Sequence, residues 1–278
     1  MSKLGVNQLR ESITEAKRIV IKVGTSSITY QSGKINLRKM EELTRVISDL
    51  QNSGKEMVLV SSGAVGAGMG KIGISEKPKE LPMKQAAAAV GQAVLMRLYE
   101  KFFNDYNQNI AQILLTRDVF SSKIKSNNAI NTFDALFKMG IIPIVNENDT
   151  VSTSELEGDR IGDNDTLSAM VSGLTKADVL LILSDVEGLC DSNPSKNPQA
   201  KLITYVDQLN EEIYGLAGDS ETEFGTGGMI TKLNAAKLAA QRSIPTVLAS
   251  SQNVNNIYEI LEGKEIGTYI SEDCLQNR

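Results

Sequence analysis

The chain contains no histidine, and this absence excludes several kinds of chemistry. Its 278 residues also include only two cysteines, Cys190 and Cys274. Without an imidazole there is no histidine general base, no Ser-His-Asp triad and no histidine-ligated metal. Two thiols are too few for a zinc ribbon or a disulfide framework, and they suit a reducing cytoplasm. Any catalysis must use lysine, arginine, carboxylates, hydroxyls and backbone amides, which are groups suited to phosphoryl transfer.

Long apolar runs and a strong net charge are missing as well. No apolar stretch approaches the roughly 18 residues that cross a bilayer, and the polar start MSKLGVNQLRESITEAK has no signal-peptide core. The 29 Lys and Arg against 34 Asp and Glu give a formal net charge of −5, which argues against a general nucleic-acid or membrane binder. With 41% hydrophobic residues, the composition is that of a globular protein, and we expect a cytoplasmic location.

Short β-branched runs alternate with longer segments of helical periodicity. Strands are predicted at residues 18–22, 57–60, 110–115, 141–145, 179–183, 246–249 and 266–270. Helices are predicted at about residues 36–52, 63–70, 84–104, 127–139, 167–174, 232–241 and 255–261. This alternation predicts an α/β fold with a mainly parallel sheet covered on both faces. Because no repeat or low-complexity linker interrupts the chain, we expect one domain over residues 1–278.

The sequence also predicts one helix start and one strand irregularity. Asn127 or Asn128 is a candidate N-cap for the helix that runs to Met139. Pro143 lies inside a predicted strand, where a missing N–H predicts a local irregularity.

Three glycine-bearing segments lie where a parallel sheet gathers its ligands, just beyond strand ends or at helix starts. Lys22 to Ser27 combines an ammonium, a glycine and three hydroxyls, Ser61 to Gly68 is a glycine-bearing turn that leads into a helix, and Gly225 to Lys232 ends in a lysine. Glycines let backbone amides approach a phosphate, and lysine neutralises its charge. Taken singly, each of the first two segments is better explained as an ordinary tight turn, and the alternative for the third is a flexible loop with a surface lysine.

Acidic and amide side chains are concentrated in other segments beside apolar strands. These are Asn146 to Thr150, Gly162 to Thr166, and the pair Ser184 and Asp185. Such groups are not buried without partners, so the alternatives are a solvated loop, a helix cap at Asp165, or a binding site. The G-x-G-x-x-G match at residues 68–73 begins well past a strand end and lacks the following acidic residue, so it is poor support for a dinucleotide site.

Several segments, in their order, resemble those of glutamate 5-kinases in the amino acid kinase family. They are IKVGTSS, VSSGAVGAG, LLTRDVF, PIVNENDTV, GDNDTLSA, LLILSDVEGL, SNP and GTGGMITK, spread from about residue 17 to about residue 270. The resemblance implies a three-layer α-β-α sandwich, with glutamate on the N-terminal half and ATP on the C-terminal half. Because the chain ends at Arg278, about where the kinase domain of the family ends, we expect no additional C-terminal domain of the PUA type.

The resemblance also implies a reaction. The γ-phosphoryl group of ATP passes to the side-chain carboxylate of L-glutamate, which gives L-glutamyl 5-phosphate and begins proline biosynthesis. Magnesium accompanies the ATP, proline is the expected feedback inhibitor, and a homo-oligomer is expected. Left as alternatives are another family member, such as an acetylglutamate or aspartate kinase, and a non-catalytic amino-acid sensor of the same fold.

Matching the family's motifs residue by residue gives a set of candidate site residues. The catalytic candidates are Lys22 and Lys232, which would stabilise the transferred phosphoryl group, and Asp165, which would hold both lysines. Candidates for binding glutamate are Ser62, Asp149 and Asn164, with Asn146 and Asp163 in second rank. Asp149 is expected to bind the α-ammonium, and Ser62 and Asn164 to donate to carboxylates. The nucleotide candidates are Lys22, Gly24, Ser184, Asp185, Thr226, Gly227, Gly228, Met229, Ile230, Thr231 and Lys232, and no protein ligand of magnesium is named.

Overall fold

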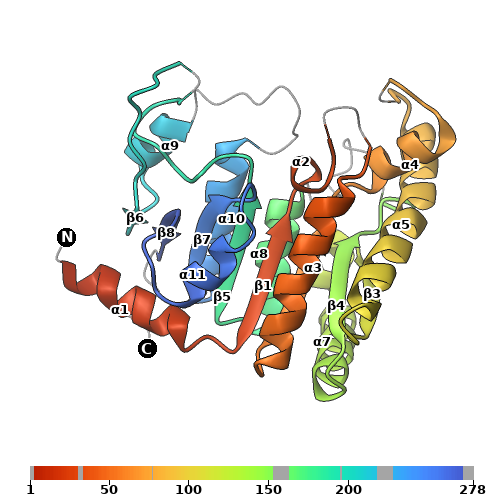
Figure 1. Cartoon of the computed structure of the whole chain (residues 1–278), viewed down its shortest axis with the longest axis horizontal. Helices are drawn as coiled ribbons and strands as arrows, with labels where there is room; N and C mark the ends of the chain where they lie inside the picture. The colour runs from red at the N-terminus through yellow and green to blue at the C-terminus, as the bar shows by residue number, and fades with distance from the viewer. Residues whose placement is uncertain are drawn as a thin grey trace. The chain divides into compact units, whose positions relative to one another are not determined.

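A computed structural model describes residues 3–30, 34–76, 78–152, 163–194, 196–217 and 228–271 of the protein (Figure 1). Its helices are α1 Lys3–Thr14, α2 Thr25–Ile28, α3 Leu37–Asn52, α4 Ala64–Ile72, α5 Leu81–Asn104, α6 Arg117–Ser121, α7 Lys123–Lys138, α8 Asn164–Thr175, α9 Glu211–Ala217, α10 Met229–Ala240 and α11 Asn256–Leu261. Its strands are β1 Arg18–Val23, β2 Glu56–Ser61, β3 Ile110–Leu115, β4 Ile142–Glu147, β5 Val179–Ser184, β6 Tyr205–Val206, β7 Thr246–Ser250 and β8 Thr268–Ile270.

The chain divides into two compact units. Unit 1 combines Met1–Lys22 with Asp165–Arg278, and unit 2 is Val23–Asn164. The predicted single kinase domain, with a glutamate half and an ATP half, stays a prediction. Among the described residues, no helix has the length and apolar character needed to span a membrane.

Unit 2 is built on parallel strands in the order β3-β4-β2. The chain runs from β2 through α5 to β3 and then back through α7 to β4, so the two crossovers run in opposite directions. Right-handed crossovers of opposite direction place their helices on opposite faces of a sheet, so α5 and α7 cover opposite faces. Helix α3 contacts α5. The sheet of this unit is therefore covered on both faces, as the alternation of strands and helices predicted.

Unit 1 carries the strand order β1-β5-β7-β8-β6. β5 and β7 are parallel, whereas β8 runs antiparallel to β7. Every residue of β5 is buried, which fits the apolar run that predicted it. The last strand, β8, is shorter than predicted and begins at Thr268, because Gly267 before it has a φ of +77°. A Cβ atom at position 267 would also lie 2.1 Å from the carbonyl oxygen of Leu248.

Two details of the sequence prediction are wrong. Helix α7 begins at Lys123 rather than at the two asparagines, because the hydroxyl of Ser122 accepts from the N–H of Lys125 at 3.4 Å and serves as the N-cap. The irregularity expected at Pro143 does not appear in the register with β3, where Pro143 pairs with Ala111. Pairing with β2 begins only at Ile144, so the missing N–H lies at the start of the strand.

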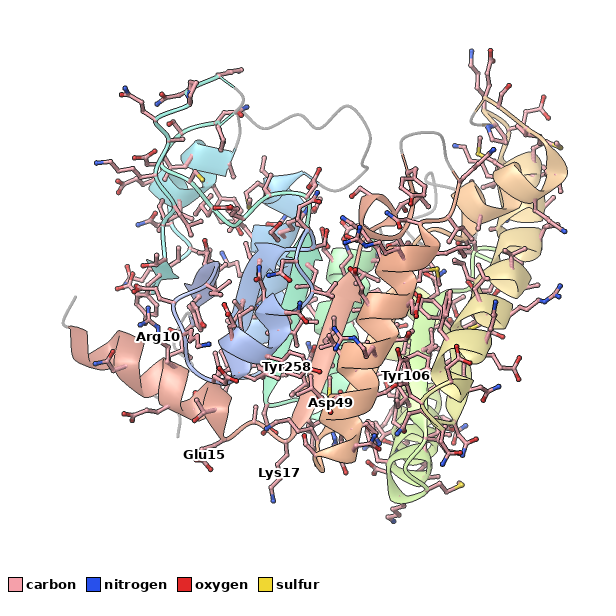
Figure 2. All side chains as sticks on the ribbon, viewed as in Figure 1. Arg10, Glu15, Lys17, Asp49, Tyr106 and Tyr258 are labelled. Carbon is pink, nitrogen blue, oxygen red and sulfur yellow. The ribbon has the colours of Figure 1, made fainter. Side chains whose placement is uncertain are left out.

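The first helix was not predicted, because the N-terminal segment is mostly polar. In α1, Leu9 and Ile13 are buried on one side, and the helix contacts α11. Arg10 lies on α1 (Figure 2). Its guanidinium lies 5.5 Å from the ring centre of Tyr269 and 2.7 Å from a carboxylate oxygen of Glu265. This helix therefore covers the end of the unit formed by β8 and α11.

Candidate active site

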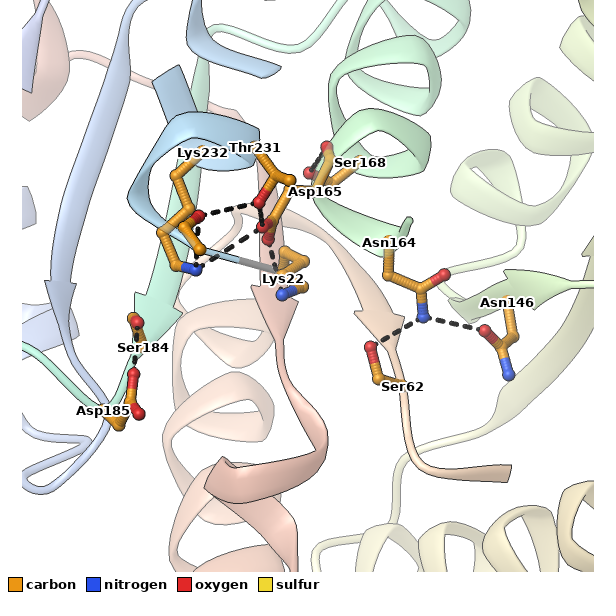
Figure 3. Close-up of polar contacts among 11 residues, drawn as sticks. Lys22, Ser62, Asn146, Asn164, Asp165, Ser168, Ser184, Asp185, Thr231 and Lys232 are labelled. Atoms are coloured by element: carbon orange, nitrogen blue, oxygen red, sulfur yellow. Dashed lines mark hydrogen bonds and ion pairs between the residues drawn. The ribbon is translucent and has the colours of Figure 1, made fainter. Parts of the chain in front are cut away.

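Three charged side chains from distant parts of the sequence meet inside unit 1. Lys22 lies in β1, Asp165 in the first turn of α8, and Lys232 in the first turn of α10 (Figure 3). The Nζ atom of Lys22 is 2.5 Å from Oδ1 of Asp165, and the Nζ atom of Lys232 is 3.6 Å from Oδ2. One carboxylate thus joins two ammonium groups, which is the contact that the predicted role of Asp165 requires.

The strand that carries Lys22 is anchored at its start. The backbone N–H groups of Lys17 and Arg18 both donate to Oδ2 of Asp178, at 2.9 and 2.8 Å. Asp178 lies directly before β5, so its carboxylate ties the start of β1 to the start of β5. This anchor helps to hold the backbone position from which Lys22 reaches Asp165.

The start of α10 supplies further contacts to the cluster. The hydroxyl of Thr231 donates to Oδ2 of Asp165 at 2.9 Å and lies 2.8 Å from the carbonyl oxygen of Gly228. That carbonyl is also 3.5 Å from Nζ of Lys232. Gly228 is the N-cap residue of α10. These contacts fix Lys232 to the helix start, where backbone N–H groups favour anions.

Burial and charge act in opposite directions on this cluster. Lys22, Asp165 and Lys232 are only 7%, 1% and 6% exposed. Burial raises the pKa of the Asp165 carboxyl, but the charges of Lys22 and Lys232, with hydrogen bonds from Lys22 and Thr231, outweigh it and leave the pKa below its ordinary value. Burial lowers the pKa of Lys232, and the charge of Asp165 partly opposes this. With all three ionised, their charges sum to +1, which suits an anionic ligand.

Several of the nucleotide candidates lie at the end of β5 and at the start of α10. Ser184, the last residue of β5, donates to a carboxylate oxygen of the exposed Asp185 at 2.9 Å. The charge of Asp185 raises the pKa of Lys232, so this carboxylate acts on the cluster. Met229 and Ile230 form the first turn of α10 with Thr231. Thr226 and Gly227 lie outside the described residues.

In unit 2, Asn164 joins two of the candidate residues for glutamate binding. Its Nδ2 donates to Oγ of Ser62 at 2.8 Å and to Oδ1 of Asn146 at 2.9 Å (Figure 3). Asn146 in turn donates through Nδ2 to Oε1 of Gln92 at 3.0 Å. Sequence reasoning missed Gln92, whose only signal was a glutamine in an alanine-rich helix. Asp149 is half-buried in the turn that begins after β4.

Backbone geometry differs between Gly24 and Gly63, which lie in two of the glycine-bearing segments found in the sequence. Gly63 follows Ser62 and caps α4 with a φ of +102°, a conformation that glycine adopts without strain. A Cβ atom there would also lie 3.1 Å from Cδ1 of Ile28. Gly24 caps α2 with a φ of −81°, which other residues tolerate. The Gly63 turn therefore depends on its residue type, whereas the conformation at Gly24 does not.

No group of three Asp, Glu or Cys side chains in the described ranges is arranged to hold a metal ion. The ligands of a magnesium ion therefore stay unassigned.

The sequence profile of the Amino acid kinase family matches residues 17–250. Glutamate 5-kinase from Clostridium perfringens (strain 13 / Type A) is 50% identical over 261 residues, which cover 94% of this chain and 97% of that protein. Glutamate 5-kinase from Moorella thermoacetica is also 50% identical over 261 residues, which cover 94% of this chain and 68% of the longer relative.

Solved structures are similar in fold at much lower identity. An isopentenyl phosphate kinase superposes with a TM-score of 0.64 at 16% identity, over 91% of this chain and 100% of that one. UMP kinase from Bacillus anthracis gives a TM-score of 0.62 at 16% identity, over 93% of this chain and 97% of that one. These neighbours establish the fold and leave the substrate open. They agree with the predicted three-layer α/β sandwich with a mainly parallel sheet.

Proposed function

Since this chain belongs to the amino acid kinase family, and within it to the glutamate 5-kinases, we propose how its residues carry out the reaction of that group. The chain transfers the γ-phosphoryl group of ATP to the side-chain carboxylate of L-glutamate and forms L-glutamyl 5-phosphate, the first step of proline biosynthesis. Two glutamate 5-kinases that are 50% identical to this chain over 94% of its length support this function. Acetylglutamate kinase, aspartate kinase and a non-catalytic sensor are not favoured.

The acceptor explains how the chain works without histidine. A glutamate side chain has a reference pKa of about 4.3 and is ionised at neutral pH. Its oxygen attacks the γ-phosphorus without losing a proton, while the bond from that phosphorus to the bridging oxygen breaks and its electron pair leaves with ADP. No proton acceptor is needed in this step, so the chemistry depends on positioning and charge.

The main obstacle is repulsion between an anionic acceptor and polyanionic ATP. Two unit charges at about 4 Å repel by about 4 kcal/mol at an effective dielectric of 20, and several such pairs arise here. The buried cluster of Lys22, Asp165 and Lys232 is the observation that carries the proposal, because it presents cations in a low-dielectric setting. Lys22 binds oxygens of the transferred group, Lys232 stabilises charge on the nucleotide side, and Asp165 holds both lysines.

ATP enters this proposal together with magnesium. When bound with ATP, magnesium would offset part of the phosphate charge, and no residue is assigned as its ligand. The nucleotide contacts proposed are Ser184, Asp185 and residues 226–232. Gly24 and Gly63 supply backbone amides near the phosphoryl group.

The product can be trapped directly. An acyl phosphate reacts with hydroxylamine to give a hydroxamate, so we expect glutamate-dependent ADP release with one hydroxamate formed per ADP. Aspartate, N-acetylglutamate and UMP should support no comparable release. ADP release that is independent of glutamate, or glutamate binding without ATP turnover, would contradict the function. The same assay with added proline tests the feedback inhibition that the resemblance implies. Sedimentation of the active protein tests the homo-oligomer that it also implies.

Asp149→Asn tests the proposed contact with the α-ammonium of glutamate. The change removes one negative charge and keeps the size of the side chain, so we expect the KM for glutamate to rise about tenfold or more while the KM for ATP changes little. Steady-state kinetics with each substrate varied in turn measure both values. Asp105→Asn, at an exposed position after α5, is the matched control and should leave both unchanged. Equal increases in the two KM values would speak against the contact.

A further inference from the structure

A chain of side-chain hydrogen bonds in unit 2 runs from α5 to Ser62. Asn146 donates to Oε1 of Gln92 at 3.0 Å, and Asn164 donates to Oδ1 of Asn146 at 2.9 Å. The same Nδ2 atom of Asn164 donates to Oγ of Ser62 at 2.8 Å. Each link joins an amide N–H to an oxygen, and Asn164 donates at both of its contacts. We call this set of amide orientations the direction of the chain.

This direction decides what Ser62 and Asn164 can offer to a substrate. An amide nitrogen carries two hydrogens, and both of those on Asn164 are used, one on Asn146 and one on Ser62. The part of the Asn164 amide that can meet a ligand is therefore Oδ1, which only accepts. The hydroxyl of Ser62 already accepts from Asn164, so its own hydrogen is the group that it can donate.

We infer that Gln92 is a positioning residue that sets Asn164 as an acceptor for the α-ammonium of glutamate and Ser62 as a donor to a carboxylate. The inference rests on the proposed function and deepens it. It replaces the expectation that Asn164 donates to a carboxylate. Gln92 does not touch glutamate; it acts through Asn146, whose Nδ2 it engages and whose Oδ1 it thereby turns toward Asn164.

Close helix packing holds Gln92 in place relative to Ser62. The neighbouring Gly91 lies so near to α4 that a Cβ atom there would be 1.7 Å from the carbonyl oxygen of Ala64, and one at Gly68 would be 1.8 Å from that of Ala87. Helix α4 begins at Ala64, two residues after Ser62. The two helices thus meet backbone to backbone, which leaves little freedom for Gln92 to shift.

The opposite direction makes a distinct prediction. If all three amides were reversed, Gln92 would donate, Ser62 would spend its hydrogen on Asn164, and Asn164 would present N–H groups to glutamate. Glutamate at position 92 can only accept once ionised, so Gln92→Glu preserves the direction inferred here and conflicts with the reversed one. Methionine at position 92 has similar length and engages neither direction.

The readout is the preference for L-glutamate over glutarate, which has the same two carboxylates and no ammonium. Glutarate is used as a competitive inhibitor against glutamate, so its Ki is obtained whether or not it is phosphorylated. The ratio of this Ki to the KM for glutamate then reports recognition of the ammonium. Charge repulsion from Gln92→Glu acts on the carboxylates of both compounds and cannot by itself lower the ratio.

In Gln92→Met we expect this ratio to fall about tenfold, because Asn164 is no longer held as an acceptor, with the KM for ATP unchanged. In Gln92→Glu the ratio should stay within about threefold of the original value or increase. The exposed Gln112 of β3 provides the controls Gln112→Met and Gln112→Glu, which should leave the ratio unchanged.

Two results would overturn the inference. An unchanged ratio in Gln92→Met, with equal weakening of glutamate and glutarate, would leave Gln92 with a structural role only. A ratio that falls in Gln92→Glu as far as in Gln92→Met would favour the reversed direction. If Gln92→Met does not fold, Gln92→Glu decides alone, since a retained ratio supports the inference and a lost one rejects it. Absence of glutamate-dependent hydroxamate formation in the unaltered protein would instead reject the proposed function.

Discussion

Lys22→Ala and Lys232→Ala are each expected to lower kcat at least about a hundredfold. A hundredfold loss corresponds to about 2.7 kcal/mol of transition-state stabilisation, less than the roughly 4 kcal/mol by which one pair of like charges repels at 4 Å. Both ammonium groups lie in a buried cluster, being 7% and 6% exposed, so bulk water cannot replace them. Glutamate-dependent ADP release, measured with both substrates saturating, gives kcat directly.

The controls separate the loss of a particular ammonium from a general effect. Lys125→Ala removes an exposed lysine of α7 and should leave kcat unchanged. Each variant should stay folded, because Asp165 keeps one ammonium partner in either one. Urea unfolding of each variant checks this. Near-normal turnover in a folded Lys22→Ala or Lys232→Ala variant would remove that lysine from the proposed mechanism.

Asp165→Asn is expected to lower the free energy of unfolding by about 3 kcal/mol at neutral pH. The substitution keeps the shape of the side chain but leaves two buried ammonium groups without the carboxylate that joins them. Deprotonation of a lysine can relieve part of the cost, which places the expected loss at the lower end for a broken buried pair. We also expect kcat to fall, since both lysines lose their common anchor.

The pH dependence of this effect has a definite sign. The pKa of Asp165 in the folded protein is lower than its ordinary value of 3.8, so its stabilising contribution is complete above that value and disappears as the pH falls through the folded pKa. The difference in unfolding free energy between the unaltered protein and Asp165→Asn should therefore shrink as the pH falls from about 5 into stronger acid.

Urea titrations at a series of pH values measure this difference. Asp118 is the matched control, because its ion pair with Lys125 is about half exposed, and Asp118→Asn should cost less than about 1 kcal/mol. Equal costs for Asp165→Asn and Asp118→Asn at neutral pH would show that the buried cluster does not contribute as described.

Much of the fold could be predicted because its signals are local. The apolar run at residues 179–183 became β5, and the periodic segment at 36–52 became α3 with slightly different bounds. Predictions failed where a tertiary contact set the element boundary. Gly267 limits β8 through its approach to Leu248, and α1 depends on packing against α11, which its polar sequence did not reveal.

The candidate site could be predicted in part for a similar reason. Parallel strands end at one edge of a sheet, so the segments after the strands were known to be important, and motif resemblance singled out Lys22, Asp165 and Lys232. Neither argument could find Gln92, because it lies within a helix and contributes only through its contact with Asn146.

The linear order of residues by itself determined the α/β class, the family and the lack of any imidazole for proton transfer, because composition, periodicity and motif spacing are properties of the chain. Only the tertiary structure decided that one carboxylate joins two lysines, and that Asn164 donates to a serine 102 positions away. Contacts of this kind depend on how helices and strands pack, and the direction of an amide depends on the partner at each end, so no local pattern in the sequence encodes them.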